Sequence, residues 1–132
     1  MQRIILLCLV LIFACKQNPK ATSPSHLVLH FTADSTGNIA EPEVRDALKE
    51  IAADIRKNAS KIIIHAYSEN SGDSVANKQI AHDMAWTAKR WLRAQGARDY
   101  NVGLDIHGYE NPLVPNQPQD IKNRRIEIER LN

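Results

Sequence analysis

The chain has 132 residues, of which 17 are Lys or Arg and 15 are Asp or Glu, so its formal net charge is +2. A charge this close to neutral, without any basic tract, excludes the electrostatic pattern of a nucleic-acid-binding protein. The length fits one domain of ordinary size, and no internal repeat is visible.

The N-terminal segment predicts export and a lipid anchor. Arg3 precedes an apolar run from Ile4 to Ala14, which is too short to span a bilayer and is typical of a secretory signal peptide. The run ends in Leu-Ile-Phe-Ala-Cys at residues 11–15, which resembles the bacterial lipobox, where the cysteine is lipidated. We therefore expect a signal peptide over residues 1–14 and lipidation of Cys15. The alternative is an ordinary signal peptide followed by a chance cysteine.

Residues 15–25 are expected to form the lipidated cysteine and a flexible tether. The segment after Cys15 is polar, contains two prolines and has no periodicity. Fully extended, it reaches about 35 Å. The only other cysteine, Cys8, would leave with the signal peptide, so the mature domain must rely on an ordinary core and not on a disulfide.

The first elements of the domain are a strand and a helix. His26–Phe31 alternates between polar and apolar residues, which predicts a strand, and residues 32–40 follow as a polar loop. Pro42 between two glutamates is typical of a helix start, and the apolar pattern stops near Asn58. The core-facing stripe of this helix comprises Val44, Leu48, Ile51, Ala52 and Ile55.

Residues 61–96 predict a strand, a polar turn and a long helix. Lys61–Tyr67 is a short, β-branched apolar run, and Ser68–Gly72 is the turn. Gly96 stands where a helix would end. Such a unit places the N–H groups of the helix N-terminus at the rim of a pocket. The apolar stripe of the helix comprises Ile80, Met84, Ala88, Trp91 and Leu92.

The C-terminal part of the chain predicts two more strands. Residues 101–107 alternate, and Val102, Leu104 and Ile106 are predicted to face the core. Residues 108–122 contain three prolines, which predicts a long loop. Residues 123–131 are predicted to form the final strand. The order β-α-β-α-β-β predicts an α+β two-layer sandwich, in which a mixed sheet carries two helices on one face.

The turn and the helix that follows it resemble the OmpA-like peptidoglycan-binding domain, the family of the OmpA C-terminal domain and the peptidoglycan-associated lipoproteins. The family pattern is Thr-Asp-x-x-Gly, then Asn, then Leu-Ser-x-x-Arg-Ala. Here residues 68–72 are Ser-Glu-Asn-Ser-Gly, position 77 is Asn, and residues 80–85 are Ile-Ala-His-Asp-Met-Ala. The Asn-Arg-Arg at residues 123–125 also matches. The resemblance implies an OmpA-like domain over residues 26–132.

The resemblance implies a ligand site for the diaminopimelate of the peptidoglycan stem peptide. The matching residues are Glu69, Ser71, Asn77 and Arg124. The ligand end is a zwitterion, so a protein carboxylate would meet its ammonium and an arginine fork its carboxylate. Met84 stands where the family has a carboxylate-binding arginine. The ordinary alternatives are a solvated loop acid at Glu69 and a strand-leading cation at Arg124.

Two functions are compatible with these residues. The first is a lipoprotein of the cell outer membrane, facing the periplasm, whose domain binds peptidoglycan non-covalently and weakly. The second is a degenerate OmpA-like module that binds a protein partner in the cell envelope, which Met84 and the short tether favour. No Gly-x-Ser-x-Gly, phosphate-loop or His-Glu-x-x-His motif is present, so we expect neither an enzyme nor a cofactor.

Four histidines and one aspartate are predicted to share the face of the sheet that points away from the helices. They are His26, His30, His65, His107 and Asp105. A zinc or copper surface is one interpretation. The solvent-facing side of a one-sided sheet is the favoured one, because no short ligand motif is present.

The two tryptophans are predicted to lie in different surroundings. Trp86 falls off the apolar stripe, where stacking against Arg90 one turn later is favoured over a contact surface. Trp91 falls on the stripe and is expected in the core.

Overall fold

The computed structural model describes residues 25–32 and 37–131. The predicted signal peptide at residues 1–14, the predicted lipidation site Cys15 and nearly all of the tether lie outside these described residues. Among the helices of the described part, none combines the length and the apolar character needed to cross a membrane.

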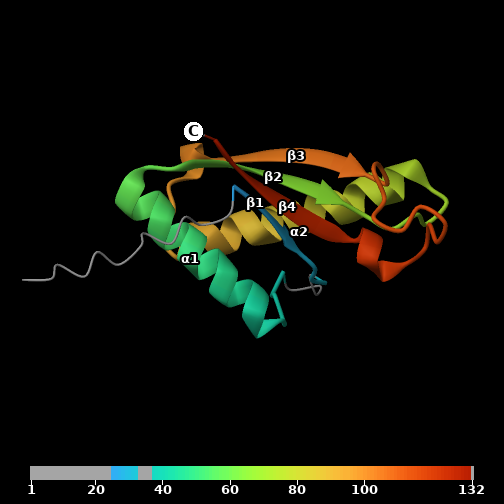
Figure 1. The fold of residues 1–132 in the computed structure, drawn as a ribbon, viewed down its shortest axis with the longest axis horizontal. Coiled ribbons are helices and arrows are strands. Elements are labelled where there is room, and N and C mark those ends of the chain that lie inside the picture. Colours follow the sequence, from blue (N-terminus) through green and yellow to red (C-terminus); the bar gives the residue numbers. More distant parts are fainter. Residues whose placement is uncertain (1–24, 33–36, 132) are drawn as a thin grey trace, which may run out of the picture.

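The chain folds in the predicted order β-α-β-α-β-β (Figure 1). The four strands form one sheet in the order β1-β4-β2-β3, in which β4 is antiparallel to both neighbours and β2 is parallel to β3. The predicted α+β class and mixed sheet are therefore confirmed. The elements are β1 (His26–Leu29), α1 (Pro42–Asn58), β2 (Lys61–Tyr67), α2 (Ser74–Ala94), β3 (Val102–Gly108) and β4 (Arg125–Leu131), with short 3-10 turns at Asp99–Asn101 and Ile121–Asn123.

The core lies between the sheet and the two helices, which cover the same face of the sheet (Figure 1). The predicted stripe of α1 is buried at all five positions. In β2 the alternation turns Ile62, Ile64 and Ala66 toward the helices, and in β4 it does the same for Ile126 and Ile128. The residues between them, such as His65, lie on the opposite face.

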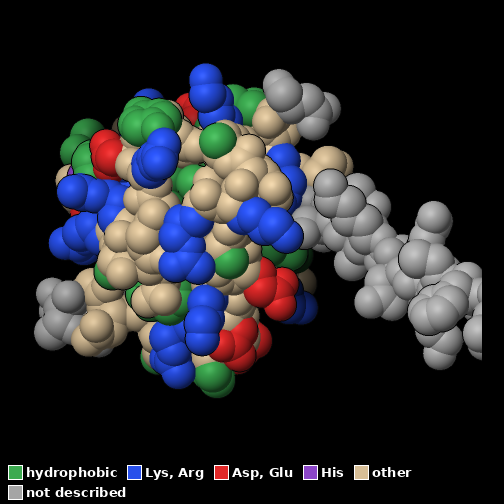
Figure 2. All heavy atoms as spheres, turned by 90° about the vertical axis from the view of Figure 1, so that its left-hand side faces the viewer, with side chains coloured by type: hydrophobic (Ala, Val, Ile, Leu, Met, Phe, Trp, Pro, Cys, Tyr) green, Lys and Arg blue, Asp and Glu red, His purple; other side chains and the backbone are tan. Residues whose placement is uncertain are grey.

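Both helices end as their sequences predict. Gly96, at φ +92°, follows α2, and the N–H of Ala97 donates to the carbonyl of Leu92 at 3.0 Å. The last turn of α1 carries Arg56 and Lys57, which complement the helix dipole. Arg56 also donates to the carbonyl of Gln95 at 2.8 Å, which links the ends of α1 and α2. Figure 2 views the molecule from this side and shows several Lys and Arg side chains spread over the surface.

Three strands differ from the prediction at their ends. β3 covers Val102–Gly108 instead of residues 101–107, because Asn101 belongs to the 3-10 turn before it. β1 ends at Leu29 instead of Phe31, because Leu29 pairs with Ile126, only one residue after β4 begins. Phe31 is nevertheless buried in the core. β4 begins at Arg125 instead of Asn123, since Asn123 belongs to a 3-10 turn and is fully buried there.

The surroundings of both tryptophans also differ from the prediction. Trp86 is exposed as predicted, but the cation over its ring is Lys89, whose Nζ lies 5.6 Å from the ring centroid. The reason is that Lys89 donates to the carbonyl of Val102 at 2.8 Å, which fixes its side chain beside Trp86. Arg90 instead contacts Thr87. Trp91 is partly buried against the core and not enclosed in it.

Candidate ligand-binding site

The candidate site is built where β2 ends and α2 begins. Asp73 is the N-cap of α2, and its Oδ1 accepts hydrogen bonds from the N–H groups of Val75 at 2.8 Å and Ala76 at 3.3 Å. Gly72 precedes it at φ +88°, in the left-handed region that favours glycine. This local sequence fixes the loop over residues 68–73 against the helix start.

The structure brings Glu69 and Arg124 together. Arg124 Nε donates to Glu69 Oε2 at 2.7 Å, and Arg124 Nη2 donates to Glu69 Oε1, so the contact is bidentate. The Arg124 side chain is only 20% exposed and the Glu69 side chain only 16%. The hydrogen bond from Arg124 lowers the pKa of Glu69 despite partial burial, and the same bond raises the pKa of Arg124. Both groups are therefore charged at neutral pH.

Ser71 and Asn77 are also adjacent, but they bind one another. Asn77 Oδ1 accepts from the Ser71 N–H at 2.9 Å and from the Ser71 hydroxyl at 2.7 Å. Asn77 Nδ2 donates to Asn70 Oδ1 at 3.3 Å, and Asn77 is buried. The first role of this pair is thus to hold the loop in shape.

Two hollows flank the loop. The larger one, of about 280 Å³, is lined by Asn70, Gly72, Ser74, Asn77, Lys78, His107, Tyr109 and Glu110. The smaller one, of about 130 Å³, is lined by Ile80, Asp83, Met84 and Arg124. Asn77 and Arg124 therefore border different hollows, and Met84 borders the one that contains the guanidinium.

The hollows contain charged residues that the sequence analysis did not single out. Asp83 lies in the smaller hollow and accepts from Gln79 at 2.8 Å. The sequence could have indicated Asp83, because it directly precedes Met84, the residue at the position of the family's arginine. Lys78 and Glu110 border the larger hollow. Lys78 directly follows Asn77, whereas Glu110 lies in the proline-containing loop, where no periodic pattern identifies it.

A four-stranded mixed sheet with two helices on one face, and a polar site at the loop before the second helix, define an OmpA-like domain. The OmpA family model matches residues 31–126, and this chain belongs to that family. The resemblance inferred from residues 68–85 is therefore confirmed.

Two curated relatives are peptidoglycan-associated lipoproteins. The one from Pseudomonas putida is 25% identical over 101 residues, which is 75% of this chain and 60% of the relative. The one from Pseudomonas aeruginosa is 23% identical over 103 residues, which is 76% of this chain and 60% of the relative. This chain thus spans about 60% of the length of these relatives.

Solved structures share the fold at lower identity. The OmpA-like domain of FopA1 from Francisella tularensis has a TM-score of 0.66 at 16% identity, covering 81% of this chain and 75% of that one. The peptidoglycan-associated lipoprotein from Burkholderia pseudomallei has a TM-score of 0.64 at 18% identity, covering 79% of this chain and 89% of that one. These structures support the fold.

Proposed function

We propose that this protein is a lipoprotein of the cell outer membrane whose domain faces the periplasm and binds peptidoglycan non-covalently. Family membership and the names of both curated relatives support the proposal. The observation that carries it is the charged pair of Glu69 and Arg124 at the loop before α2. Ser71 and Asn77 complete the proposed site by holding the loop that presents Glu69.

The chemistry of the pair suits a zwitterionic ligand such as diaminopimelate. Arg124 uses two of its five N–H groups on Glu69, which leaves three for a ligand carboxylate. Each oxygen of Glu69 has a second acceptor site, which can take a hydrogen bond from a ligand ammonium. One pair of side chains therefore offers both charges that the ligand requires.

Met84 makes this binding weak. Its side chain is 2% exposed and borders the small hollow beside Arg124, where the family pattern has an arginine. A thioether cannot donate to a carboxylate, so one charge-assisted contact of about 1.5–3 kcal/mol is missing. We expect an affinity lower by about tenfold or more than that of a site with both guanidinium groups.

Attachment to the membrane is proposed to occur through lipid on Cys15. Two acyl chains anchor a protein stably, where one chain is marginal. The tether up to residue 25 would then connect the lipid to β1.

The burial of Met84 favours a second candidate function. A site with a packed methionine at the position of the family's arginine lacks one of the two guanidinium groups that would bind a ligand carboxylate. Such a domain would serve as an interaction module for another protein of the cell envelope. Binding to purified cell walls separates the two functions.

Co-sedimentation with purified peptidoglycan sacculi tests the proposal. The wild type should sediment, whereas Glu69→Gln and Arg124→Gln should remain mostly in the supernatant. Asp54→Asn is the matched control, because Asp54 and Arg130 form another partly buried ion pair, near the opposite end of β4. This control should sediment like the wild type. Absence of wild-type binding at any salt concentration would favour the protein-partner function. Equal binding of all four proteins would show that Glu69 and Arg124 are not the wall site.

A further inference from the structure

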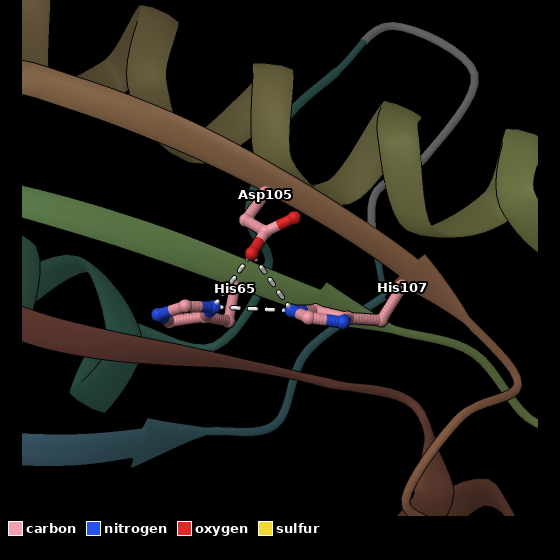
Figure 3. Close-up of side chains that lie close together, drawn as sticks. All are labelled: His65, Asp105 and His107. Carbon is pink, nitrogen blue, oxygen red and sulfur yellow. Dashed lines mark hydrogen bonds and ion pairs between the residues drawn. The ribbon is translucent and has the colours of Figure 1, made fainter.

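On the face of the sheet opposite the helices, His65 of β2 converges with Asp105 and His107 of β3 (Figure 3). His65 Nδ1 lies 3.0 Å from His107 Nε2 and 3.4 Å from Asp105 Oδ2. His107 Nε2 lies 3.3 Å from the same Asp105 oxygen. We propose that these three side chains, the His65 trio, bind a zinc ion. His107 also borders the larger hollow beside Asn77, but the trio does not include Glu69 or Arg124, the pair that carries the proposed peptidoglycan site.

The spacing of the three ligand atoms fits a tetrahedral ion. Zinc lies about 2.0–2.1 Å from nitrogen and oxygen ligands, which puts neighbouring ligands of a tetrahedron about 3.3–3.4 Å apart. The three ligand atoms form a triangle whose sides of 3.0, 3.3 and 3.4 Å are close to these values. An ion just above the plane of the triangle would reach all three atoms with little movement. A square-planar site would instead place two of the three ligand atoms on opposite sides of the ion, about 4 Å apart.

Each histidine also has a carboxylate at its other ring nitrogen. His65 Nε2 lies 3.0 Å from Glu129 Oε2, and His107 Nδ1 lies 3.4 Å from Glu110 Oε2. Metal-bound histidines usually donate their second ring N–H to such a group, which fixes the tautomer and orients the ring. The two glutamates come from β4 and from the loop after β3, so β2, β3, this loop and β4 all contribute to the arrangement.

The outer carboxylates have a consequence for the centre of the trio. A neutral imidazole has one ring proton, and each ring has a carboxylate on the outside to receive it. In the tautomer in which each ring proton points to the outer carboxylate, His65 Nδ1, His107 Nε2 and Asp105 Oδ2 are three acceptors that face one another without a donor. A cation between them removes this repulsion, and two imidazole ligands favour zinc over the oxygen-preferring Mg²⁺ or Ca²⁺.

Packing holds the trio in place while leaving it open to solvent. The His107 ring stacks on Tyr67 at a centroid distance of 4.5 Å and an angle of 5°, and the Arg125 guanidinium lies 4.0 Å from the Tyr67 ring centroid. The two histidine side chains are 19% exposed and Asp105 is 55% exposed. The fourth position of a bound ion therefore faces water. A one-sided sheet alone would predict a merely solvated face here, whereas the convergence of His65, Asp105 and His107 supports a metal site.

Isothermal titration of the full chain with Zn²⁺ tests the inference. The protein is kept in detergent micelles because of its apolar N-terminal run, purified without a metal-binding tag and treated with a chelator. We expect one Zn²⁺ per chain and no heat from Mg²⁺. Asp105→Asn should lose the ion without unfolding, because this side chain is exposed and the change preserves its shape. Glu129→Gln should weaken binding by about 10–100-fold, as expected for loss of a carboxylate that orients a ligand histidine.

The matched control is His26→Gln. His26 lies on the same face and pairs with Glu127 at 3.0 Å, but it does not contact the trio. This variant should bind Zn²⁺ like the wild type. No binding of Zn²⁺ to the wild type, or equal binding to Asp105→Asn with circular dichroism showing both proteins folded, would overturn the proposal.

Discussion

Met84 of α2 and Arg124, the residue before β4, border the same hollow. The family pattern has an arginine at position 84, so in this chain one guanidinium lies where two are expected. Asp83 lies in the same hollow and offers a carboxylate that could hold a second cation. The hollow is therefore the place where one substitution should strengthen the proposed wall binding.

Met84→Arg should tighten binding to sacculi by about tenfold or more, because the new guanidinium adds a contact to the ligand carboxylate. Stability should fall by about 1–3 kcal/mol, since Met84 is packed in the core. Co-sedimentation and urea denaturation measure the two effects. Met84→Leu is the matched control, and it should cost less than about 1.5 kcal/mol and leave binding unchanged. A folded Met84→Arg protein without tighter binding would contradict the proposed ligand geometry.

The pair of Glu69 and Arg124 should make stability depend on pH in the acidic range. The folded pKa of Glu69 lies below its ordinary value of 4.5, so the unfolded chain takes up this proton first. The stabilisation is complete above pH 4.5 and is lost as the pH falls through the folded pKa. In Glu69→Gln the loss of stability on acidification should be smaller, as measured by urea unfolding over a pH series. Arg124→Gln should show a similarly reduced slope, and slopes equal to the wild type would argue against the pair.

Core substitutions should follow the observed burial. Leu48→Ala in α1 and Ile64→Ala in β2 should each destabilise the domain by about 2–5 kcal/mol, because both side chains are fully buried. Trp86→Ala should cost much less, since this ring is exposed on α2. Chemical denaturation gives the three values, and similar losses at all three positions would be inconsistent with this packing.

The loop before α2 should depend more on Asn77 than on Ser71. Asn77→Ala leaves the Ser71 N–H and hydroxyl without their acceptor, which should cost about 1–3 kcal/mol. Ser71→Ala removes the hydroxyl bond to Asn77 and two longer contacts of the hydroxyl with the Asp73 backbone, at 3.3 and 3.4 Å, but keeps the bond from the residue 71 N–H to Asn77, and it should cost about 0.5–1.5 kcal/mol. Thermal denaturation would show the order, and a larger loss for Ser71→Ala would reverse the assignment of roles.

Cys15→Ser should release the protein from membranes into the soluble periplasmic fraction, because the proposed acyl chains are its anchor. Cell fractionation with immunodetection measures the distribution. Cys8→Ser is the matched control, since Cys8 lies inside the predicted signal peptide, and it should leave the protein in the membrane. Recovery of the wild type in the soluble fraction would exclude the lipid anchor.

Local patterns predicted the elements well, because alternation and helical periodicity report which face of each element is buried. The stripe of α1 and the stop at Gly96 are examples. The pairing of the strands is non-local, so the order β1-β4-β2-β3 could not be deduced from periodicity. Lys89 was missed as the cation over Trp86 because its position depends on the carbonyl of Val102, in another element.

The candidate site was predictable in part. The family pattern identified Glu69 and Arg124, but their direct contact depends on how the loop after β2 meets the residue before β4. Alternation placed His65, His107 and Asp105 on one face. Their convergence required the parallel register that sets His65 opposite Asp105. Glu110, in an irregular loop, could be connected to His107 only by the folded structure.

The position of β4 has a consequence for how the domain folds. β4 is the last of the four strands in the chain, yet it lies between β1 and β2 and pairs with both. During synthesis, β1 and β2 therefore emerge before the strand that joins them. Until then β1 has no neighbour in its sheet, and the edge of β2 that will receive β4 stays unpaired and open to other chains. Closing the sheet requires contacts between distant parts of the sequence, which slows folding relative to helical domains of similar size.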